Sequence, residues 1–251
     1  MNFVIQEDET IEDLQLNGLR LIQKKNGFRF GMDSVLLADF ADIRPSDTVV
    51  DLGSGNGVLP ILLAGRGKGS RYYAVEIQEE AAALAERNAA LNQLETRMNV
   101  LHCDAGVVQR HFPPCGVDAV ICNPPYGRPE ATLSSPVPEK AIARSQAVDT
   151  LDRFLTGAFL ILKGKGKLSL VYPAPQMLYL MNLLQSHHLE PKRFRLVYPY
   201  EDKPANLVLV EAVKDAKPTL HPLPPLIIYQ KNGDLTNELK SVYHIQEQTE
   251  F

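Results

Sequence analysis

The strongest constraint on the fold of this chain is the alternation, from residue 48 to about 213, of short apolar runs with longer amphipathic stretches. This alternation is typical of βαβ units, which form a mainly parallel sheet with helices on both faces. The predicted strands lie near 48–52, 71–75, 98–102, 117–122, 167–171, 193–198 and 206–213. The predicted helices lie near 58–65, 78–91, 148–162 and 175–186. We therefore expect an open α/β sheet of seven strands, with ligands beyond the carboxyl ends of its parallel strands.

Three parts of the chain differ in their patterns. Residues 1–46 form an N-terminal cap segment with a short helix, for which Asp33 is a candidate N-cap. Residues 47–214 form the α/β domain, whose last two strands are joined too closely for a helical crossover and should pair antiparallel. Residues 215–251 form a C-terminal extension, Pro-rich at first and helical near 235–244. We expect the first segment to cover the ligand side and the extension to pack on the core.

Composition limits the partners and the compartment. The longest apolar run, residues 58–64, is far shorter than the roughly 20 residues of a membrane-spanning helix, and the N-terminus has no secretory pattern. We therefore expect a cytoplasmic protein without a membrane segment. The three cysteines have no CxxC spacing, so neither a disulfide framework nor a bound metal is expected. The net charge of −4 gives no general basic excess, so a nucleic-acid partner would need a local basic patch.

A glycine-rich loop follows the first strand of the α/β domain. Residues 49–57 read Val-Val-Asp-Leu-Gly-Ser-Gly-Asn-Gly, and glycines at such a turn let the backbone approach a nucleotide closely. A dinucleotide-binding G-x-G-x-x-G motif would need glycine where Val58 stands, and the Lys-Ser/Thr pair of a P-loop is missing here. The pattern D-x-G-x-G-x-G instead resembles the first motif of class I methyltransferases. That resemblance implies a Rossmann-like fold that binds S-adenosylmethionine.

Acidic side chains stand at the ends of three successive predicted strands. Asp51 immediately precedes the loop, where its carboxylate suits the ammonium group of the methionine portion or orders the loop itself. Glu76 ends the second strand and is placed to accept both ribose hydroxyls. Asp104 follows the third strand and can accept a hydrogen bond from the adenine amine of the cofactor. Together these positions predict an S-adenosylmethionine site.

The fourth strand runs directly into the tetrapeptide Asn123-Pro124-Pro125-Tyr126. Two prolines cannot continue a central strand, so the chain must leave the sheet in a stiff, extended turn. The Asn123 side-chain carbonyl and the Pro124 backbone carbonyl can each accept one N–H, which aims the nitrogen at the methyl donor. Tyr126 offers a ring on which a flipped-out base can stack. The tetrapeptide therefore predicts methylation of a planar amine or amide nitrogen, and leaves the choice between them open.

These residues, with the order of the whole chain, resemble the tRNA1(Val) adenine N6-methyltransferases of the small-methyltransferase-domain group. Similar segments also lie outside the core, at residues 27–37, 203–211 and 225–229. The resemblance implies methylation of the N6 amine of adenine 37 in tRNA1(Val). It implies catalytic roles for Asn123, Pro124, Pro125 and Tyr126. It implies cofactor-binding roles for Asp51, Gly53, Ser54, Gly55, Asn56, Gly57, Glu76, Ile77, Asp104, Ala105 and Asn123.

The segment after the tetrapeptide departs from the family pattern. Residues 143–146 read Ala-Arg-Ser-Gln where that family has a sequence like Ala-Arg-His-Glu, so we expect the substrate-side loop of residues 127–147 to be tuned differently. This departure leaves the exact RNA target open, but not the transfer chemistry. Arg128, Lys140 and Arg144 lie closest in sequence to the tetrapeptide and are the candidate tRNA contacts.

Three other functions fit parts of the pattern. A protein glutamine N5-methyltransferase also uses Asn-Pro-Pro-Tyr, but that family resembles this one with a helical N-terminal domain added, whereas only 46 residues precede the α/β domain here. An rRNA guanine N2-methyltransferase resembles this core but more often has Phe or Trp where Tyr126 stands. A noncatalytic, nucleotide-binding RNA scaffold would not need Asn123 and Tyr126.

Overall fold

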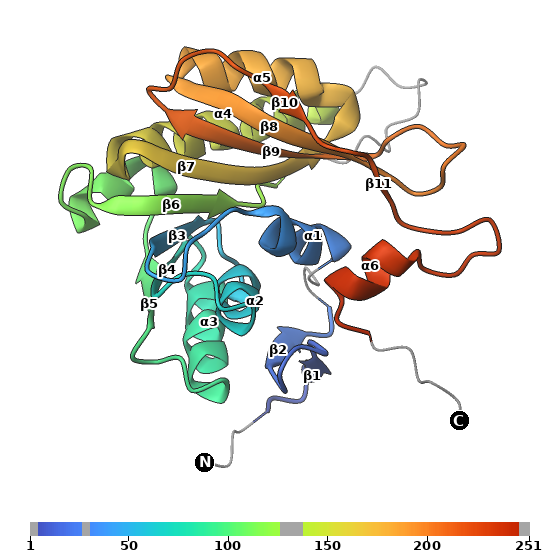
Figure 1. Cartoon of the computed structure of the whole chain (residues 1–251). Coiled ribbons are helices and arrows are strands. Elements are labelled where there is room, and N and C mark those ends of the chain that lie inside the picture. The colour runs from blue at the N-terminus through green and yellow to red at the C-terminus, as the bar shows by residue number, and fades with distance from the viewer. Residues whose placement is uncertain (1–4, 27–30, 126–137, 246–251) are drawn as a thin grey trace.

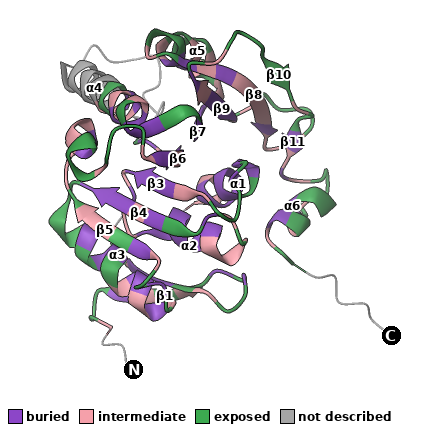
Figure 2. Cartoon of the chain, turned by 60° about the vertical axis from the view of Figure 1, so that its left-hand side comes forward, coloured by how far each residue is buried: buried purple, intermediate pink, exposed green. Residues whose placement is uncertain are grey.

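The computed structural model describes residues 5–26, 31–125 and 138–245, and in the helix that begins at Pro138 it describes side chains from Thr150 onward. Within these residues a nine-stranded sheet carries helices on both faces (Figures 1 and 2). Its strands are β3 (Thr48–Leu52), β4 (Arg71–Glu76), β5 (Met98–His102), β6 (Val117–Cys122), β7 (Leu162–Pro173), β8 (Leu189–Tyr198), β9 (Leu207–Lys214), β10 (His221–Pro222) and β11 (Leu226–Ile227). The order is β10-β8-β9-β7-β6-β3-β4-β5, and β11 also pairs with β8.

The predicted α/β sheet is confirmed, with two strands more than expected. β9 runs antiparallel to both β7 and β8, which gives the expected hairpin. The expectation of seven strands was wrong because β10 and β11 pair in parallel with β8. Each has only two residues and lies in a Pro-rich segment. Because proline has no N–H to donate, the prolines keep each paired segment short. Segments this short show no alternating strand pattern in the sequence.

Two groups of helices cover the two faces of the sheet. The helices are α1 (Met32–Phe40), α2 (Val58–Gly65), α3 (Glu79–Leu91), α4 (Pro138–Ile161), α5 (Met177–Ser186) and α6 (Asn237–Val242), with 3-10 turns η1 (Ala105–His111) and η2 (Ala174–Gln176). One apolar core joins a face of the sheet to α1, α2, α3 and α6. The other core joins the opposite face to α4, α5 and η1. Neighbouring residues such as Val49 and Val50 belong to different cores, as the alternation of side chains along a strand requires.

The start of α1 differs from the expectation. The N-cap is Gly31, and it makes no side-chain capping bond. Asp33 lies inside the first turn, where its Oδ1 accepts the N–H of Ser34 at 3.1 Å. The N-cap prediction for Asp33 was therefore wrong by two residues, although a carboxylate in the first turn still suits the helix dipole.

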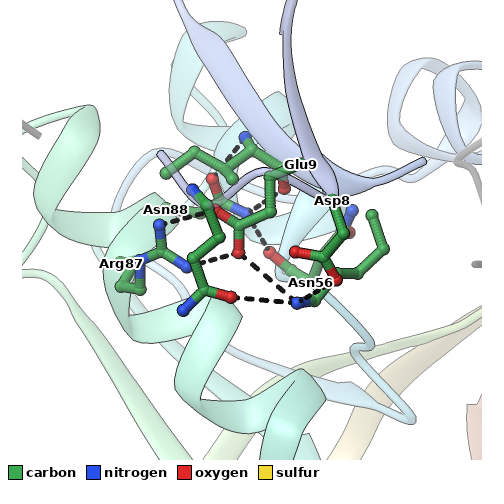
Figure 3. Close-up of polar contacts among 8 residues, drawn as sticks. Asp8, Glu9, Asn56, Arg87 and Asn88 are labelled. Atoms are coloured by element: carbon green, nitrogen blue, oxygen red, sulfur yellow. Dashed lines mark hydrogen bonds and ion pairs between the residues drawn. The ribbon is translucent and has the colours of Figure 1, made fainter. Parts of the chain in front are cut away.

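The N-terminal segment contains a β-hairpin that the sequence pattern did not predict. Its strands β1 (Glu9–Asp13) and β2 (Arg20–Lys24) form a separate antiparallel sheet. The hairpin is held to α3 by Asn88, which is fully buried and hydrogen-bonds both backbone groups of Ile22, at 2.6 and 2.9 Å. Asn88 also donates to the Asn56 carbonyl at 2.9 Å, and Arg87 forms an ion pair with Glu9 at 2.6 Å (Figure 3). The glycine loop is thus tied through α3 to the hairpin.

The described helices include none with both the length and the apolar character needed to cross a bilayer.

Candidate active site

The parallel strands β6, β3, β4 and β5 bring their carboxyl ends to one edge of the sheet. Asp51 lies within the carboxyl-terminal half of β3, Glu76 ends β4, Asp104 follows β5 and Asn123 follows β6. Four of the predicted site residues therefore share this edge, which is where open α/β sheets bind their ligands.

The glycine loop turns sharply between β3 and α2. Gly53 and Gly57 have φ values of +73° and +82°, in the left-handed region that favours glycine. A Cβ at Gly57 would lie 2.7 Å from the Met98 side chain, and one at Gly53 would lie 2.8 Å from the Phe154 ring. The N–H groups of Gly53 and Ser54 both donate to the Val75 carbonyl at 2.9 Å, which anchors the loop to the end of β4. Glycine is therefore required at both ends of this turn.

Asp51 is buried at the base of the loop, and one of its two carboxylate oxygens has a hydrogen-bond partner. Its Oδ2 accepts the Ser54 hydroxyl at 2.6 Å, whereas Oδ1 has no hydrogen-bond partner within the described part of the chain. Burial raises the pKa of Asp51 to about 7, and the nearby charge of Glu76 adds to the effect. A buried carboxylate oxygen without a partner is costly, so this position favours a ligand that brings a positively charged donor.

Glu76 links the glycine loop to the turn after β4. Its side chain is buried, and its oxygens accept the N–H of Gly55 at 2.8 Å and of Gln78 at 2.9 Å. Each carboxylate oxygen has a second lone pair, so this arrangement leaves capacity to accept hydroxyl groups. The neighbouring Ile77 is 59% exposed, an apolar surface next to this carboxylate.

Asp104 forms an ion pair with Arg153, which was not among the predicted site residues. Its Oδ1 accepts the N–H of Gly106 at 2.7 Å and so caps η1, and its Oδ2 pairs with Arg153 of α4 at 2.6 Å. Ala105, the next residue in the chain, is buried. An adenine amine that reaches Asp104 would share this carboxylate with Arg153. Because Arg153 is 49 residues further along the chain, only the tertiary structure brings the pair together.

Asn123 is the first residue after β6, and it is followed by the buried Pro124 and the exposed Pro125. The Nδ2 of Asn123 donates to the hydroxyl of Ser34 at 3.3 Å. Ser34 is 2% exposed in the first turn of α1 and was not among the predicted site residues. Because the two polar atoms of a carboxamide point in different directions, this bond directs Oδ1 of Asn123 away from Ser34. The N-terminal segment thus orients the side chain on which the predicted chemistry depends.

Several predicted residues are not among the described side chains. Tyr126 and Arg128 lie outside the described residues, and the side chains of Lys140 and Arg144 lie in the undescribed part of α4. Their roles stay predictions.

The methyltransferase small domain family model matches residues 30–188. The chain belongs to this family. A curated relative from Aliivibrio salmonicida, named tRNA1(Val) (adenine(37)-N6)-methyltransferase, is 28% identical over 208 residues, which cover 82% of this chain and 86% of the relative.

Two solved structures have a similar fold. A predicted O-methyltransferase from Agrobacterium tumefaciens has a TM-score of 0.68 at 24% identity, over 85% of this chain and 96% of the other. The M. jannaschii protein TYW2, solved in complex with AdoMet, has a TM-score of 0.57 at 18% identity, over 84% and 88% of the two chains.

Proposed function

We propose that this methyltransferase transfers the methyl group of S-adenosylmethionine to the N6 amine of an adenine in tRNA, namely adenine 37 of tRNA1(Val). The observation that carries the proposal is the position of Asn123. It follows β6 at the edge that also holds Asp51 and Glu76, and Ser34 orients its carboxamide. The name of the relative from Aliivibrio salmonicida, which matches over most of both chains, supports the choice of substrate.

The described residues fit the cofactor. The Oδ1 of Asp51 is buried without a partner, which suits the ammonium group of the methionine portion. The remaining lone pairs of Glu76 suit the ribose hydroxyls, and Ile77 and Ala105 offer apolar contacts for the adenine ring, with Asp104 at its amine. When bound, S-adenosylmethionine supplies a methyl group activated by a sulfonium. We assign the loop residues Gly53, Ser54, Gly55, Asn56 and Gly57 to the backbone contacts beneath the methionine portion.

The residues after β6 position the amine that is methylated. The Oδ1 of Asn123 and the carbonyl of Pro124 each accept one N–H of the adenine N6, which reduces delocalisation of its lone pair into the ring and directs it at the methyl group. Pro125 stiffens the turn, and Tyr126 stacks on the base after the base has left its loop. After transfer the nitrogen loses one proton to water, so no strong base is needed. Positioning of this kind can supply up to roughly 7–11 kcal/mol.

The three segments of the chain have distinct proposed roles. We propose that residues 1–46 act as a cap segment, residues 47–214 as the catalytic domain and residues 215–251 as an extension, and that Arg128, Lys140 and Arg144 contact the tRNA backbone. The ion pairs and hydrogen bonds from Asn88, Arg87 and Ser34 support a direct structural link between the cap segment and the catalytic domain. A cytoplasmic site of action follows, since the substrate is tRNA.

The proposal is tested in cells by nucleoside mass spectrometry of purified tRNA from a strain that lacks the coding gene. We expect N6-methyladenosine to disappear from tRNA1(Val) and to return when the wild-type gene, but not the Asn123→Ala variant, is restored. Unchanged N6-methyladenosine in all tRNA would refute the proposal. Loss of a methylated glutamine in a protein, with intact tRNA modification, would favour a glutamine N5-methyltransferase instead.

A further inference from the structure

A pocket lies outside the proposed cofactor site, between the loop after β8 and the segment that begins in β11. It is open, has a volume of about 510 Å³, and its walls combine apolar, aromatic and polar side chains. This size is within the range of small-ligand pockets. The residues that line it are Tyr200, Glu201, Asp202, Ile227, Tyr229, Gln230, Lys231, Asn232 and Thr236.

Two tyrosines form its aromatic wall. The rings of Tyr200 and Tyr229 have centroids 5.4 Å apart and are inclined at 33°, and both side chains are half-buried. Rings this close pack on each other, and because both are only half-buried, part of their aromatic surface lines the pocket. Such a surface suits a planar, apolar face laid against it, as a nucleobase provides.

The pocket opens on the same edge of the sheet as Asn123. β8 runs in the same direction as β6, because β9 is antiparallel to both β7 and β8 and β7 is parallel to β6. The loop after β8 therefore leaves the sheet on the side where β6 ends, and Figure 1 shows the segment after β11 on that side as well. Three strand spacings separate β6 from β8, which is about 14 Å sideways across the sheet.

The wall of the pocket also packs on the apolar core that includes the helix with Ser34. Tyr229 and Tyr243 pack on the apolar core that contains α1 and α6. Burial raises the pKa of Tyr243 to about 12, and the charges of Asp33 and Tyr229 add to this effect. Asp33 is adjacent in sequence to Ser34, which binds Asn123. Tyr229 on the pocket wall and the helix that carries Ser34 therefore pack on the same apolar core.

The charges favour a base over a phosphate inside the pocket. The carboxylates of Glu201 and Asp202 on the wall repel an anion, but can accept hydrogen bonds from the amino groups of a base. The exposed Lys231 on the lining provides positive charge at the rim for a flanking phosphate, whereas Lys203 in the loop after β8 lies 3.9 Å from Asp202 and pairs with it.

We infer that the pocket of Tyr200 and Tyr229 is a second nucleobase subsite, which holds an unpaired base of the anticodon loop other than the adenine that is methylated. This inference rests on the proposed tRNA substrate and adds to it a second point of recognition. Sequence-specific binding of RNA commonly uses unstacked loop bases laid on aromatic rings. Holding a second base would fix the register of the loop, so that one adenine reaches Asn123.

The test compares steady-state methylation of tRNA1(Val) transcript by the wild type, Tyr200→Ala, Tyr229→Ala and the ring-preserving Tyr229→Phe. We expect the alanine variants to raise the KM for tRNA by roughly 5- to 100-fold, with a smaller change in kcat and unchanged S-adenosylmethionine affinity by calorimetry. Tyr229→Phe should stay close to wild type. Unchanged KM in both alanine variants would overturn the subsite while leaving the proposed function intact. Wild-type protein that methylates no tRNA would overturn the proposed function itself.

A second measurement changes the RNA, and compares the effect of each change on two proteins. Anticodon stem-loop RNAs that carry one abasic nucleotide at each loop position in turn are assayed with wild type and Tyr200→Ala. We expect one position, other than the target adenine, at which base removal weakens wild-type binding but adds little to the effect of Tyr200→Ala. If every abasic position weakens both proteins equally, the pocket holds no base.

A pair of lysine variants tests whether Lys231 at the rim contacts a phosphate of the tRNA. Lys231→Ala should lower the dependence of tRNA affinity on salt by about one phosphate contact. Lys217→Ala is the matched control, because Lys217 is also exposed but lies before β10, at the opposite edge of the sheet. Equal salt dependence in the two variants would contradict a phosphate contact at the rim.

Discussion

The cofactor half and the RNA-facing half of the proposed active site are built in different ways. In the cofactor half, the carboxylates of Glu76 and Asp104 are held by backbone N–H groups within 2.9 Å. In the RNA-facing half, the pocket of Tyr200 and Tyr229 is lined by half-buried rings, by Ile227 of β11 and by mostly exposed polar side chains. A small cofactor of fixed shape needs a rigid, preorganised site, whereas an RNA loop needs a broad surface from several segments. Substitutions in the two halves should therefore affect different kinetic constants.

The largest expected effect separates chemistry from binding. Asn123→Ala removes the carboxamide oxygen that accepts the amine N–H, and we expect kcat to fall by about 100- to 1,000-fold, the range seen when one positioned polar group is lost. The affinity for S-adenosylmethionine should change little, as measured by calorimetry. Asn99→Ala, at an exposed position on β5, is the control. Near-normal turnover of the Asn123 variant would remove the basis of the mechanism.

The next effect should be confined to the cofactor half. Glu76→Ala loses the bonds to the Gly55 and Gln78 N–H groups as well as the acceptor for the ribose, so we expect cofactor affinity to fall by about 10- to 100-fold. Calorimetric titration of S-adenosylmethionine measures it, with Glu86→Ala on the exposed face of α3 as control. If both variants bind equally well, the ribose contact must lie elsewhere.

The pH dependence of cofactor binding should also report on this half. The pKa of Asp51 is raised to about 7 by burial and by Glu76, so the free protein holds this proton below neutral pH. An ammonium group favours the ionised form, so binding below that pKa releases a proton, and affinity should rise roughly tenfold between about pH 6 and pH 7.5.

Two variants separate this effect from the titration of the cofactor. Asp51→Asn should lose most of the pH dependence, whereas Asp47→Asn, just before β3 at the opposite edge, should keep it. The same slope in wild type and Asp51→Asn would show that Asp51 does not face the ammonium group.

The smallest effect tests the link between the N-terminal segment and the catalytic turn. Ser34→Ala removes the acceptor that orients the Asn123 carboxamide, so we expect kcat to fall by about 2- to 10-fold with cofactor affinity unchanged. Ser34→Thr, which keeps the hydroxyl, should recover activity. If it does not recover while both variants melt at the wild-type temperature, Ser34 acts through packing and not through this hydrogen bond.

The site residues near strand ends could be predicted from the sequence. Asp51 and Glu76 are adjacent to strand ends, and their roles depend on short-range patterns, so their common edge follows from the order of the elements. Ser34 and Arg153 were missed because their partners, Asn123 and Asp104, are 89 and 49 residues away. No local pattern records such contacts.

Two elements of the fold were missed for related reasons. The hairpin of β1 and β2 depends on the side chains of Asn88 and Asn92, which bond to the backbone of β2 from a distant helix. The strands β10 and β11 are brought to β8 by tertiary pairing of two-residue segments in a Pro-rich stretch. In each case a distant partner, and not the local propensity, determines the structure.

The most direct test is methylation in vitro of tRNA1(Val) transcript by the purified protein with S-adenosylmethionine, followed by mass spectrometry of the ribonuclease fragments. We expect a single added methyl group, recovered as N6-methyladenosine at position 37, and none when that adenine is replaced by guanine or when Asn123→Ala is used. A methyl group on another nucleotide would contradict adenine 37 as the substrate. Transfer that persists in Asn123→Ala would contradict the catalytic role of Asn123.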